Sequence, residues 1–188
     1  MSSYQQGVYM KKIFFLTTFF LLSCVSLSKP GSSPVRTVDY VDLNRYLGDW
    51  YEIASFPQWF QKGCFCTRAQ YSLRENDKID VLNTCHKDSI HGDLKSAHGY
   101  AKVVDTKSNA KLKVTFFWPF FGDYWIIGLD KDYRYVVVTS PDRSTLWILS
   151  RTPELPADLY EEAIQIAKGQ GLDLSKLQIN DNKRCDYR

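Results

Sequence analysis

Five cysteines and three histidines are the side chains in this sequence best suited to nucleophilic, metal-binding or disulfide chemistry. The histidines fall in a polar turn region. The closely spaced Cys64 and Cys66 lack a second such pair at the spacing of a zinc site. We therefore expect neither metal binding nor thiol catalysis. The residues concerned are Cys24, Cys64, Cys66, Cys85, Cys185, His86, His91 and His98.

The number of cysteines suits disulfide bonds. If Cys24 is set aside as an acceptor for a lipid, four cysteines remain, which is an even number. An exported protein folds in a compartment where thiols oxidise, so these four cysteines are expected to pair. A bond between Cys64 and Cys66 would close a strained ring, so we disfavour it. Two pairings stay open at this point: Cys64–Cys85 with Cys66–Cys185, or Cys64–Cys185 with Cys66–Cys85.

A second pattern pairs a tryptophan with a distant arginine. Trp50 follows Gly48, which permits a tight turn into a strand, and Arg151 closes the last strand-like segment. A planar guanidinium stacks well on an indole face. The sequence has no Gly-X-Ser-X-Gly elbow, no His-Glu-X-X-His and no glycine-rich phosphate loop. We expect a binding protein without catalytic residues or cofactor rather than an enzyme.

The N-terminal segment resembles the signal peptide of a bacterial lipoprotein. Met10, the expected start of translation, opens a positive segment, and a short apolar run follows that is too short for a comfortable membrane span. Leu21-Leu22-Ser23-Cys24 resembles a lipobox, which implies removal of residues 1–23 and acylation of Cys24 with palmitate-type chains. An ordinary secretory signal is the alternative.

Composition divides the remaining chain into a tether and one domain. Residues 24–38 are rich in Ser, Pro and Lys and predict a flexible lipidated tether, and residues 39–188 are long enough for one domain. The formal net charge of +3 falls to +1 when Lys11 and Lys12 are removed with the signal. This near-neutral charge argues against a nucleic-acid partner. Both a monomer and a homodimer fit the sequence.

Strand and turn signals predict an all-β fold. Many short strands joined by short turns are typical of an up-and-down antiparallel barrel, and a sandwich is the alternative. A helix with Leu159, Ala163 and Ile166 on one face is predicted to start near Pro156 and end at Gly169 or Gly171, followed by a short strand at 176–180. The eight expected strands are 50–56, 65–74, 78–85, 96–104, 111–117, 124–130, 134–139 and 146–151.

Four motifs resemble the lipocalin family, in the branch that holds bacterial outer-membrane lipocalins and apolipoprotein D. They are Tyr-Leu-Gly-Asp-Trp-Tyr-Glu-Ile-Ala (46–54), Gln-Tyr-Ser-Leu-Arg-Glu-Asn (70–76), Ser-Pro-Asp-Arg (140–143) and Leu-Trp-Ile-Leu-Ser-Arg-Thr-Pro (146–153). The resemblance implies an eight-stranded barrel with an external C-terminal helix and with Arg151 packed across Trp50 at its base. It also implies the disulfides Cys64–Cys85 and Cys66–Cys185.

The resemblance places a ligand pocket inside the barrel. Tyr71 and Trp147 match an aromatic pair that lines the pocket in apolipoprotein D, and alternation places Leu149 on the face of Trp147. A solid core is the structural alternative. Glu52 and Phe56 share the face of Trp50, where a carboxylate needs a partner unless a bend turns it to solvent. The expected ligand-binding residues are Tyr71, Trp147, Leu149, Ala69, Glu52, Phe56, Trp59, Phe116 and Trp118.

Two aromatic segments are expected at the mouth of the barrel. The segment 116–121 contains Pro119, so we expect a loop there that contacts a membrane interface or folds over the pocket as a lid. The segment 56–60 follows the first strand and is expected to rim the same opening.

The expected function is lipid binding. The resemblance implies a lipid-anchored protein of the bacterial outer membrane, facing the periplasm, that binds a fatty acid or a lysophospholipid in the storage or transport of membrane lipids. One alternative is a lipocalin-type isomerase with a free pocket thiol. Another is a structural envelope lipoprotein with a filled barrel.

Overall fold

The structure is a computed structural model that describes residues 33–74 and 78–187. The predicted signal segment, Cys24 and most of the predicted tether lie outside the described residues. Within the described residues, no helix has the length and apolar character needed to cross a membrane.

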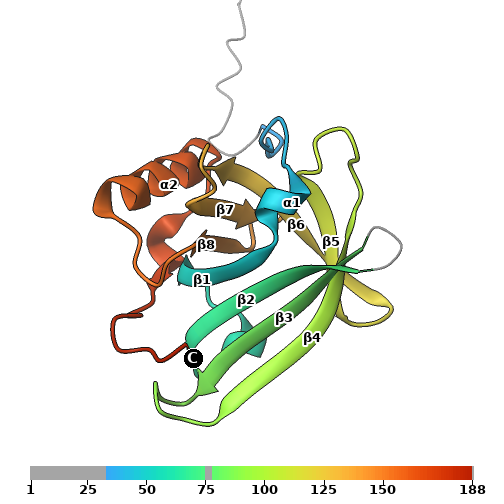
Figure 1. The fold of residues 1–188 in the computed structure, drawn as a ribbon. Coiled ribbons are helices and arrows are strands. Elements are labelled where there is room, and N and C mark those ends of the chain that lie inside the picture. The colour runs from blue at the N-terminus through green and yellow to red at the C-terminus, as the bar shows by residue number, and fades with distance from the viewer. Residues whose placement is uncertain (1–32, 75–77, 188) are drawn as a thin grey trace, which may run out of the picture.

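Eight antiparallel strands form the barrel predicted from the sequence (Figure 1). Each strand pairs with the next along the chain, and β8 and β2 both pair with β1, which closes the barrel. A ninth strand, β9 (Gln178–Ile179), pairs with the second half of β1, close to the short strand predicted at 176–180. The strands are β1 (Gly48–Ser55), β2 (Cys64–Arg74), β3 (Lys78–Lys87), β4 (Leu94–Val103), β5 (Lys111–Phe117), β6 (Phe120–Leu129), β7 (Tyr135–Thr139) and β8 (Leu146–Ser150).

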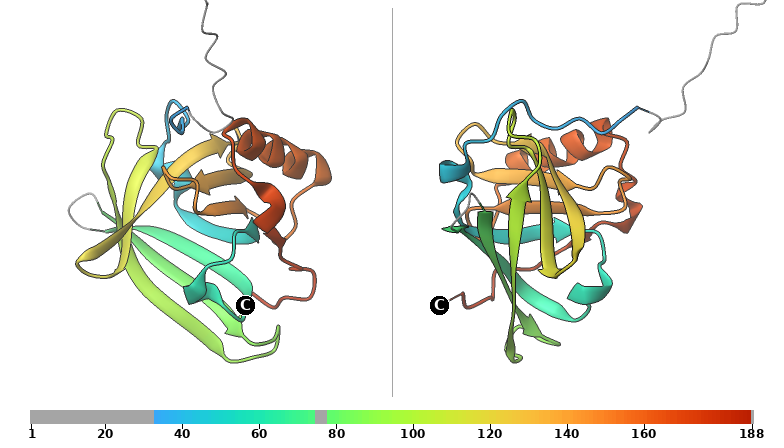
Figure 2. Two further views of the ribbon diagram at one scale, coloured as in Figure 1. Left: turned by 180° about the vertical axis from the view of Figure 1, so that it is seen from behind. Right: turned by 90° about the vertical axis from the view of Figure 1, so that its right-hand side faces the viewer.

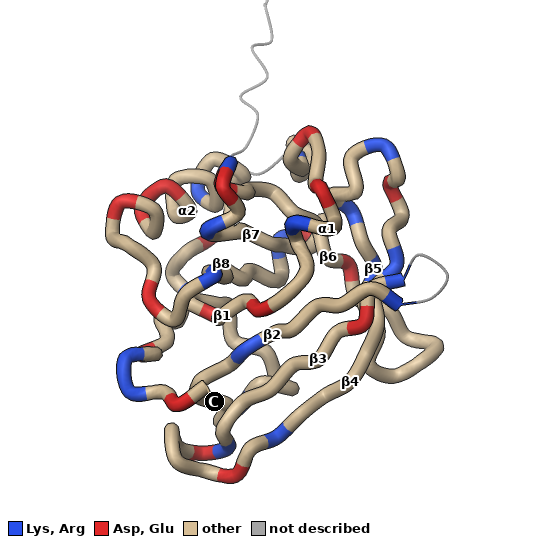
Figure 3. The backbone as a smooth tube through the Cα atoms, in the orientation of Figure 1, with Lys and Arg blue, Asp and Glu red and all other residues tan. Residues whose placement is uncertain are grey.

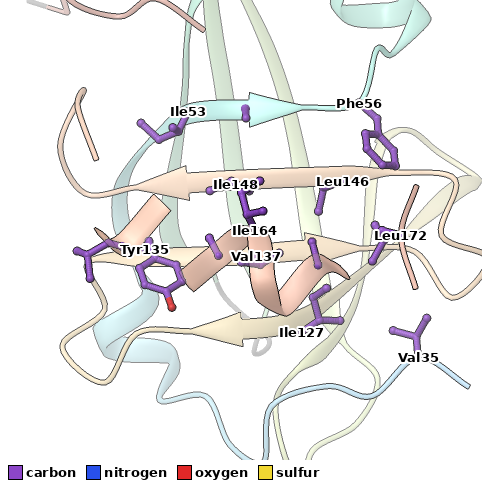
Figure 4. Close-up of a cluster of buried hydrophobic side chains, with 14 residues drawn as sticks. Val35, Ile53, Phe56, Ile127, Tyr135, Val137, Leu146, Ile148, Ile164 and Leu172 are labelled. Atoms are coloured by element: carbon purple, nitrogen blue, oxygen red, sulfur yellow. The ribbon is translucent and has the colours of Figure 1, made fainter. Parts of the chain in front are cut away.

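The predicted helix is α2 (Ala157–Gly169), and it packs on the outside of the barrel. Its apolar face is buried against β6 and β7 (Figure 4). At Gly128 of β6 the helix approaches so closely that a Cβ atom would lie 2.8 Å from Ile166 Cδ1, so a larger residue would force the Ile166 side chain to shift. Three short helices were not predicted: α1 (Leu43–Tyr46), η1 (Trp59–Gln61) and η2 (Leu174–Lys176).

A β-bulge in β1 corrects the prediction for Phe56. Glu52 pairs with Leu149, and Ala54 pairs with Ile148, so Ile53 is an extra residue that reverses the alternation of side chains. Trp50 therefore lies inside the barrel, whereas Ala54 and Phe56 lie in the cluster beneath α2 (Figure 4). The expectation that Phe56 faces the pocket is wrong, because the bulge interrupts the alternation of side chains between the two faces of β1.

The expected loop at 116–121 is also wrong. Strand β5 continues to Phe117 and β6 begins at Phe120, so only Trp118 and Pro119 form the turn. Pro119 lies in the turn, where it interrupts no ladder hydrogen bond, so the aromatic residues on both sides can stay in strands.

The barrel wall separates at two places toward its mouth. Strands β1 and β2 pair only from Gly48 to Tyr51, and β4 and β5 pair only from Tyr100 to Val103. Beyond these points β2, β3 and β4 extend together away from the strands under α2, as the views in Figure 2 show. The two cavities described below lie at these separations.

Candidate functional site

Arg151 closes the base of the barrel against Trp50. Its guanidinium carbon lies 3.8 Å from the centre of the indole ring, which is fully buried. The same guanidinium donates hydrogen bonds to the backbone oxygens of Asp49 and Arg45. Gly48, with a φ of 92°, adopts the left-handed conformation that glycine tolerates and lies beside this guanidinium. Burial lowers the pKa of Arg151.

Three tyrosines fill the lower part of the barrel above Trp50. The hydroxyl groups of Tyr46 and Tyr124 are 2.7 Å apart, and those of Tyr71 and Tyr124 are 3.2 Å apart. Burial raises the pKa of each of the three tyrosines, so they are neutral in the physiological range. Tyr71 thus points into the barrel, as the lipocalin resemblance implied, but a tyrosine network occupies the floor rather than open space.

A buried carboxylate lies higher in the barrel. Glu52 is only 5% exposed, so no bend turns it to solvent, and Arg151 is not its partner. Its Oε1 accepts hydrogen bonds from Ser55 Oγ at 2.7 Å and from Asn180 Nδ2 at 3.1 Å. Its Oε2 accepts one from Gln61 Nε2 at 2.7 Å. Within the part of the chain that the structure describes, no salt bridge involves this carboxylate.

Gln61 connects this carboxylate to the predicted pocket residue Trp147. The indole Nε1 of Trp147 donates to Gln61 Oε1 at 3.1 Å, while the amide of Gln61 donates to Glu52. The short helix η1, which contains Gln61, is therefore held against the barrel by a chain of hydrogen bonds. Sequence analysis missed both residues, because Gln61 lies in none of the predicted strands and Asn180 ends a predicted short strand to which no neighbour was assigned.

A cavity of about 700 Å³ lies beside Glu52, where β1 separates from β2. Its walls come from the β1–β2 connection, the start of β2 and the C-terminal segment after η2. The apolar lining residues are Pro57, Trp59, Phe65, Ile90 and Ile179, and the charged ones are Glu52, Lys62, Asp181 and Arg184.

A second cavity, of about 540 Å³, lies where β4 separates from β5. Phe116 and Trp118 line it together with residues of β2, β3 and β4. Trp59 and Trp118, which were expected to rim one opening, therefore line different cavities. Trp147, Leu149 and Ala69 pack in the interior cluster with Tyr71 and line neither.

Two disulfides hold the region around the first cavity. Cys64 bonds Cys85, and Cys66 bonds Cys185, the pairing that the lipocalin resemblance implied. The second bond attaches the C-terminal segment to β2. Asn180 and Asn182 of that segment also donate to the backbone oxygen of Glu52. The C-terminal segment is therefore part of the wall beside the carboxylate.

Comparison with known proteins agrees with this architecture. A family model described as a lipocalin-like domain matches residues 41–182. Outer membrane lipoprotein Blc of Escherichia coli K12 is 39% identical over 158 residues, which cover 84% of this chain and 88% of the relative. Temperature-induced lipocalin-1 of Arabidopsis thaliana is 41% identical over 152 residues, which cover 76% of this chain and 80% of the relative. This chain belongs to the lipocalin family.

More distant relatives share the fold. Apolipoprotein D of Macaca fascicularis is 34% identical over 166 residues, covering 85% of each chain. The solved structure of insecticyanin from Manduca sexta superimposes with a TM-score of 0.64 at 24% identity and covers 81% of this chain and 87% of that one.

Proposed function

We propose that this lipocalin is anchored to the bacterial outer membrane through Cys24, faces the periplasm and binds a lysophospholipid or a fatty acid for storage or transport of membrane lipids. Membership of the lipocalin family and several relatives named outer membrane lipoprotein support the proposal. The Leu21–Cys24 motif supplies an acceptor thiol at the right distance from an apolar segment. Each methylene of an acyl anchor contributes about 0.8 kcal/mol of membrane affinity.

The observation that carries the ligand assignment is the buried carboxylate of Glu52. A buried carboxylate held only by neutral donors lacks the cation that normally compensates its desolvation. It lies on a cavity whose volume of about 700 Å³ falls within the usual range for small-molecule sites. An ammonium group of a ligand would supply the missing cation.

The remaining lining fits a zwitterionic head group on an acyl chain. Lys62 and Arg184 offer positive charge for a phosphate, while Trp59, Phe65 and Ile179 offer apolar area. A fatty acid would bring a second carboxylate toward Glu52, and like charges in a buried site repel. We therefore favour a lysophospholipid with an ammonium head group over a fatty acid.

Substitution of Glu52 tests this assignment. Glu52→Gln should weaken binding of lysophosphatidylethanolamine by about tenfold to a hundredfold, because a charge-assisted hydrogen bond to the ammonium is lost. Binding of oleate should stay the same or become stronger. Calorimetric titration of the delipidated protein measures both affinities.

Glu154→Gln is the matched control, because Glu154 lies outside the cavity. Equal affinities of wild type and Glu52→Gln for the lysophospholipid would exclude an ammonium at this carboxylate. Absence of saturable binding of both lipids would instead favour a structural lipoprotein, since three tyrosines already fill the barrel floor.

Anchoring is tested separately. Cys24→Ala removes the thiol that would carry the acyl chain, so the variant should incorporate no label from radioactive palmitate, whereas wild type should be labelled. Cys185→Ala is the control for loss of a cysteine elsewhere. Labelling of Cys24→Ala would show that the acyl group, if any, is attached at another residue.

We propose a binding protein rather than an enzyme. An isomerase with a pocket thiol would need a free cysteine near a cavity. The four cysteines within the described residues are all in disulfides. Titration with a thiol reagent under native conditions therefore separates the two functions.

A further inference from the structure

Four cations stand side by side across the outer face of the barrel. Arg74 pairs with Lys78, Lys78 with Lys102, and Lys102 with Lys113 in the register of strands β2 to β5. We call Arg74, Lys78, Lys102 and Lys113 the cation row. Figure 3 shows Lys and Arg positions gathered along β5 and at the adjoining ends of β2 and β3.

The cation row is unfavourable for the barrel itself, since like charges directly opposite one another destabilise a sheet. Asp80 pairs with Arg74 and Asp123 pairs with Lys113. Among the described residues, Lys78 and Lys102 instead rest on aromatic rings, those of Tyr100 and Phe121. Lys111, next to Lys113 on the same face, rests on Trp125. This face combines flat aromatic surfaces with cations.

Three exposed aromatic side chains project beyond the cation row. Phe117, Trp118 and Phe120, which we call the aromatic tip, are each more than three quarters exposed, so they do not fold over the barrel as a lid. Phe120 is three residues from Asp123, the partner of Lys113, on the same strand. At about 3.3 Å per residue, the aromatic tip extends about 10 Å past the row.

The second cavity joins these two features. Its lining includes Arg74 and Tyr100 at the cation row and Trp118 at the aromatic tip. Figures 1 and 2 show the β5–β6 hairpin projecting on its own at this side of the barrel, away from α2. The cation row, the second cavity and the aromatic tip therefore form one continuous surface.

We propose that the cation row and the aromatic tip form a docking surface for a phospholipid bilayer that contains anionic lipids. Tryptophan and phenylalanine favour the interfacial region of a membrane, and lysine and arginine favour its phosphates. A separation of about 10 Å places the aromatic tip below the head groups when the cations contact the phosphates. The surface orients the barrel on the membrane, and it functions whatever ligand the Glu52 cavity holds.

Quenching of Trp118 fluorescence by brominated lipids tests the proposal. The protein without residues 1–23 and with Cys24→Ala, which lacks the proposed acyl anchor and serves as the reference called wild type here, is mixed with vesicles of brominated phosphatidylcholine, with or without phosphatidylglycerol. The signal of its Trp118→Phe variant is subtracted to isolate that of Trp118. Wild type should be quenched, much more strongly with phosphatidylglycerol, and high salt should remove the difference. The double variant Lys102→Gln/Lys113→Gln should partition into anionic vesicles about 30-fold more weakly, and the variant Lys102→Arg/Lys113→Arg should bind like wild type.

Lys168→Gln/Lys176→Gln is the matched control, because it removes two exposed lysines from α2 and η2, outside the docking surface. Glu75 and Asp77, which lie between Arg74 and Lys78 in the sequence, are kept in every variant. Three results would overturn the proposal. They are quenching that does not depend on phosphatidylglycerol, equal losses of vesicle binding in the glutamine variant and the control variant, and loss of vesicle binding in the arginine variant. Binding to soluble polyglutamate without quenching would also overturn it and would identify an acidic polymer as the partner. Lysophospholipid affinity should be unchanged in the row variants, which separates this surface from the Glu52 site.

Discussion

Replacing Cys66 and Cys185 together by serine is expected to lower the free energy of unfolding by about 5 kcal/mol. The bond closes a loop with a sequence separation of 119, so its loss greatly increases the conformational entropy of the unfolded chain. In the folded protein, the C-terminal segment would lose its covalent attachment to β2. Because Asn180 and Asn182 of this segment hold Glu52, we also expect the wall beside the carboxylate to loosen.

Denaturant unfolding of the double variant measures the first effect, and hydrogen exchange of residues 178–182 measures the second. The matched control is Cys64→Ser with Cys85→Ser. Its loop has a separation of only 21, so the same relation gives a loss of about 3 kcal/mol. If the two double variants were equally stable, loop length would not govern the contribution of these bonds.

Replacing Arg151 by alanine is expected to lower the free energy of unfolding by about 3 kcal/mol. The change removes a guanidinium that covers a fully buried indole at 3.8 Å and leaves the backbone oxygens of Asp49 and Arg45 without their donor. The base of the barrel would then admit water toward Trp50. Lipid affinity should change less, because the Glu52 cavity lies higher in the barrel.

Arg151→Lys separates charge from shape in this prediction. Lysine keeps the positive charge but cannot stack as a plane while donating two separate hydrogen bonds, so it should recover only part of the stability. Arg184→Ala, at an exposed position, should change stability little. Denaturant unfolding ranks the variants, and unchanged stability of Arg151→Ala would show that the contact with Trp50 contributes nothing.

The sequence alone supports most of the barrel. Alternation of apolar side chains and turn residues indicated all eight strands, and a three- and four-residue period indicated α2. The contact between Trp50 and Arg151 was implied by the lipocalin resemblance of the motifs around them. The strands and the helix are encoded locally, because the direction of a side chain in a regular strand or helix follows from its position in the repeat.

Departures from the regular strand and helix repeats could not be predicted from the periodicity of the sequence. The bulge at Ile53 turned Phe56 toward α2, and the turn at Trp118–Pro119 was shorter than a proline in an aromatic run suggested. Both depend on how one strand fits its neighbour. The position of a bulge is chosen by the whole sheet, since the extra residue must be accommodated against the partner strand.

The composition of the candidate site was decided only by the tertiary structure. Glu52 was identifiable as a carboxylate that needs a partner, but only Ser55 among its donors lies on the same strand, and the other two come from the η1 segment and from a C-terminal segment attached by a disulfide. The cation row likewise joins residues of four strands that no local pattern connects. The sequence determined which faces are apolar and which residues carry charge. Closure of the barrel determined which of those charges meet, because register between distant strands is a property of the packed sheet rather than of any one segment.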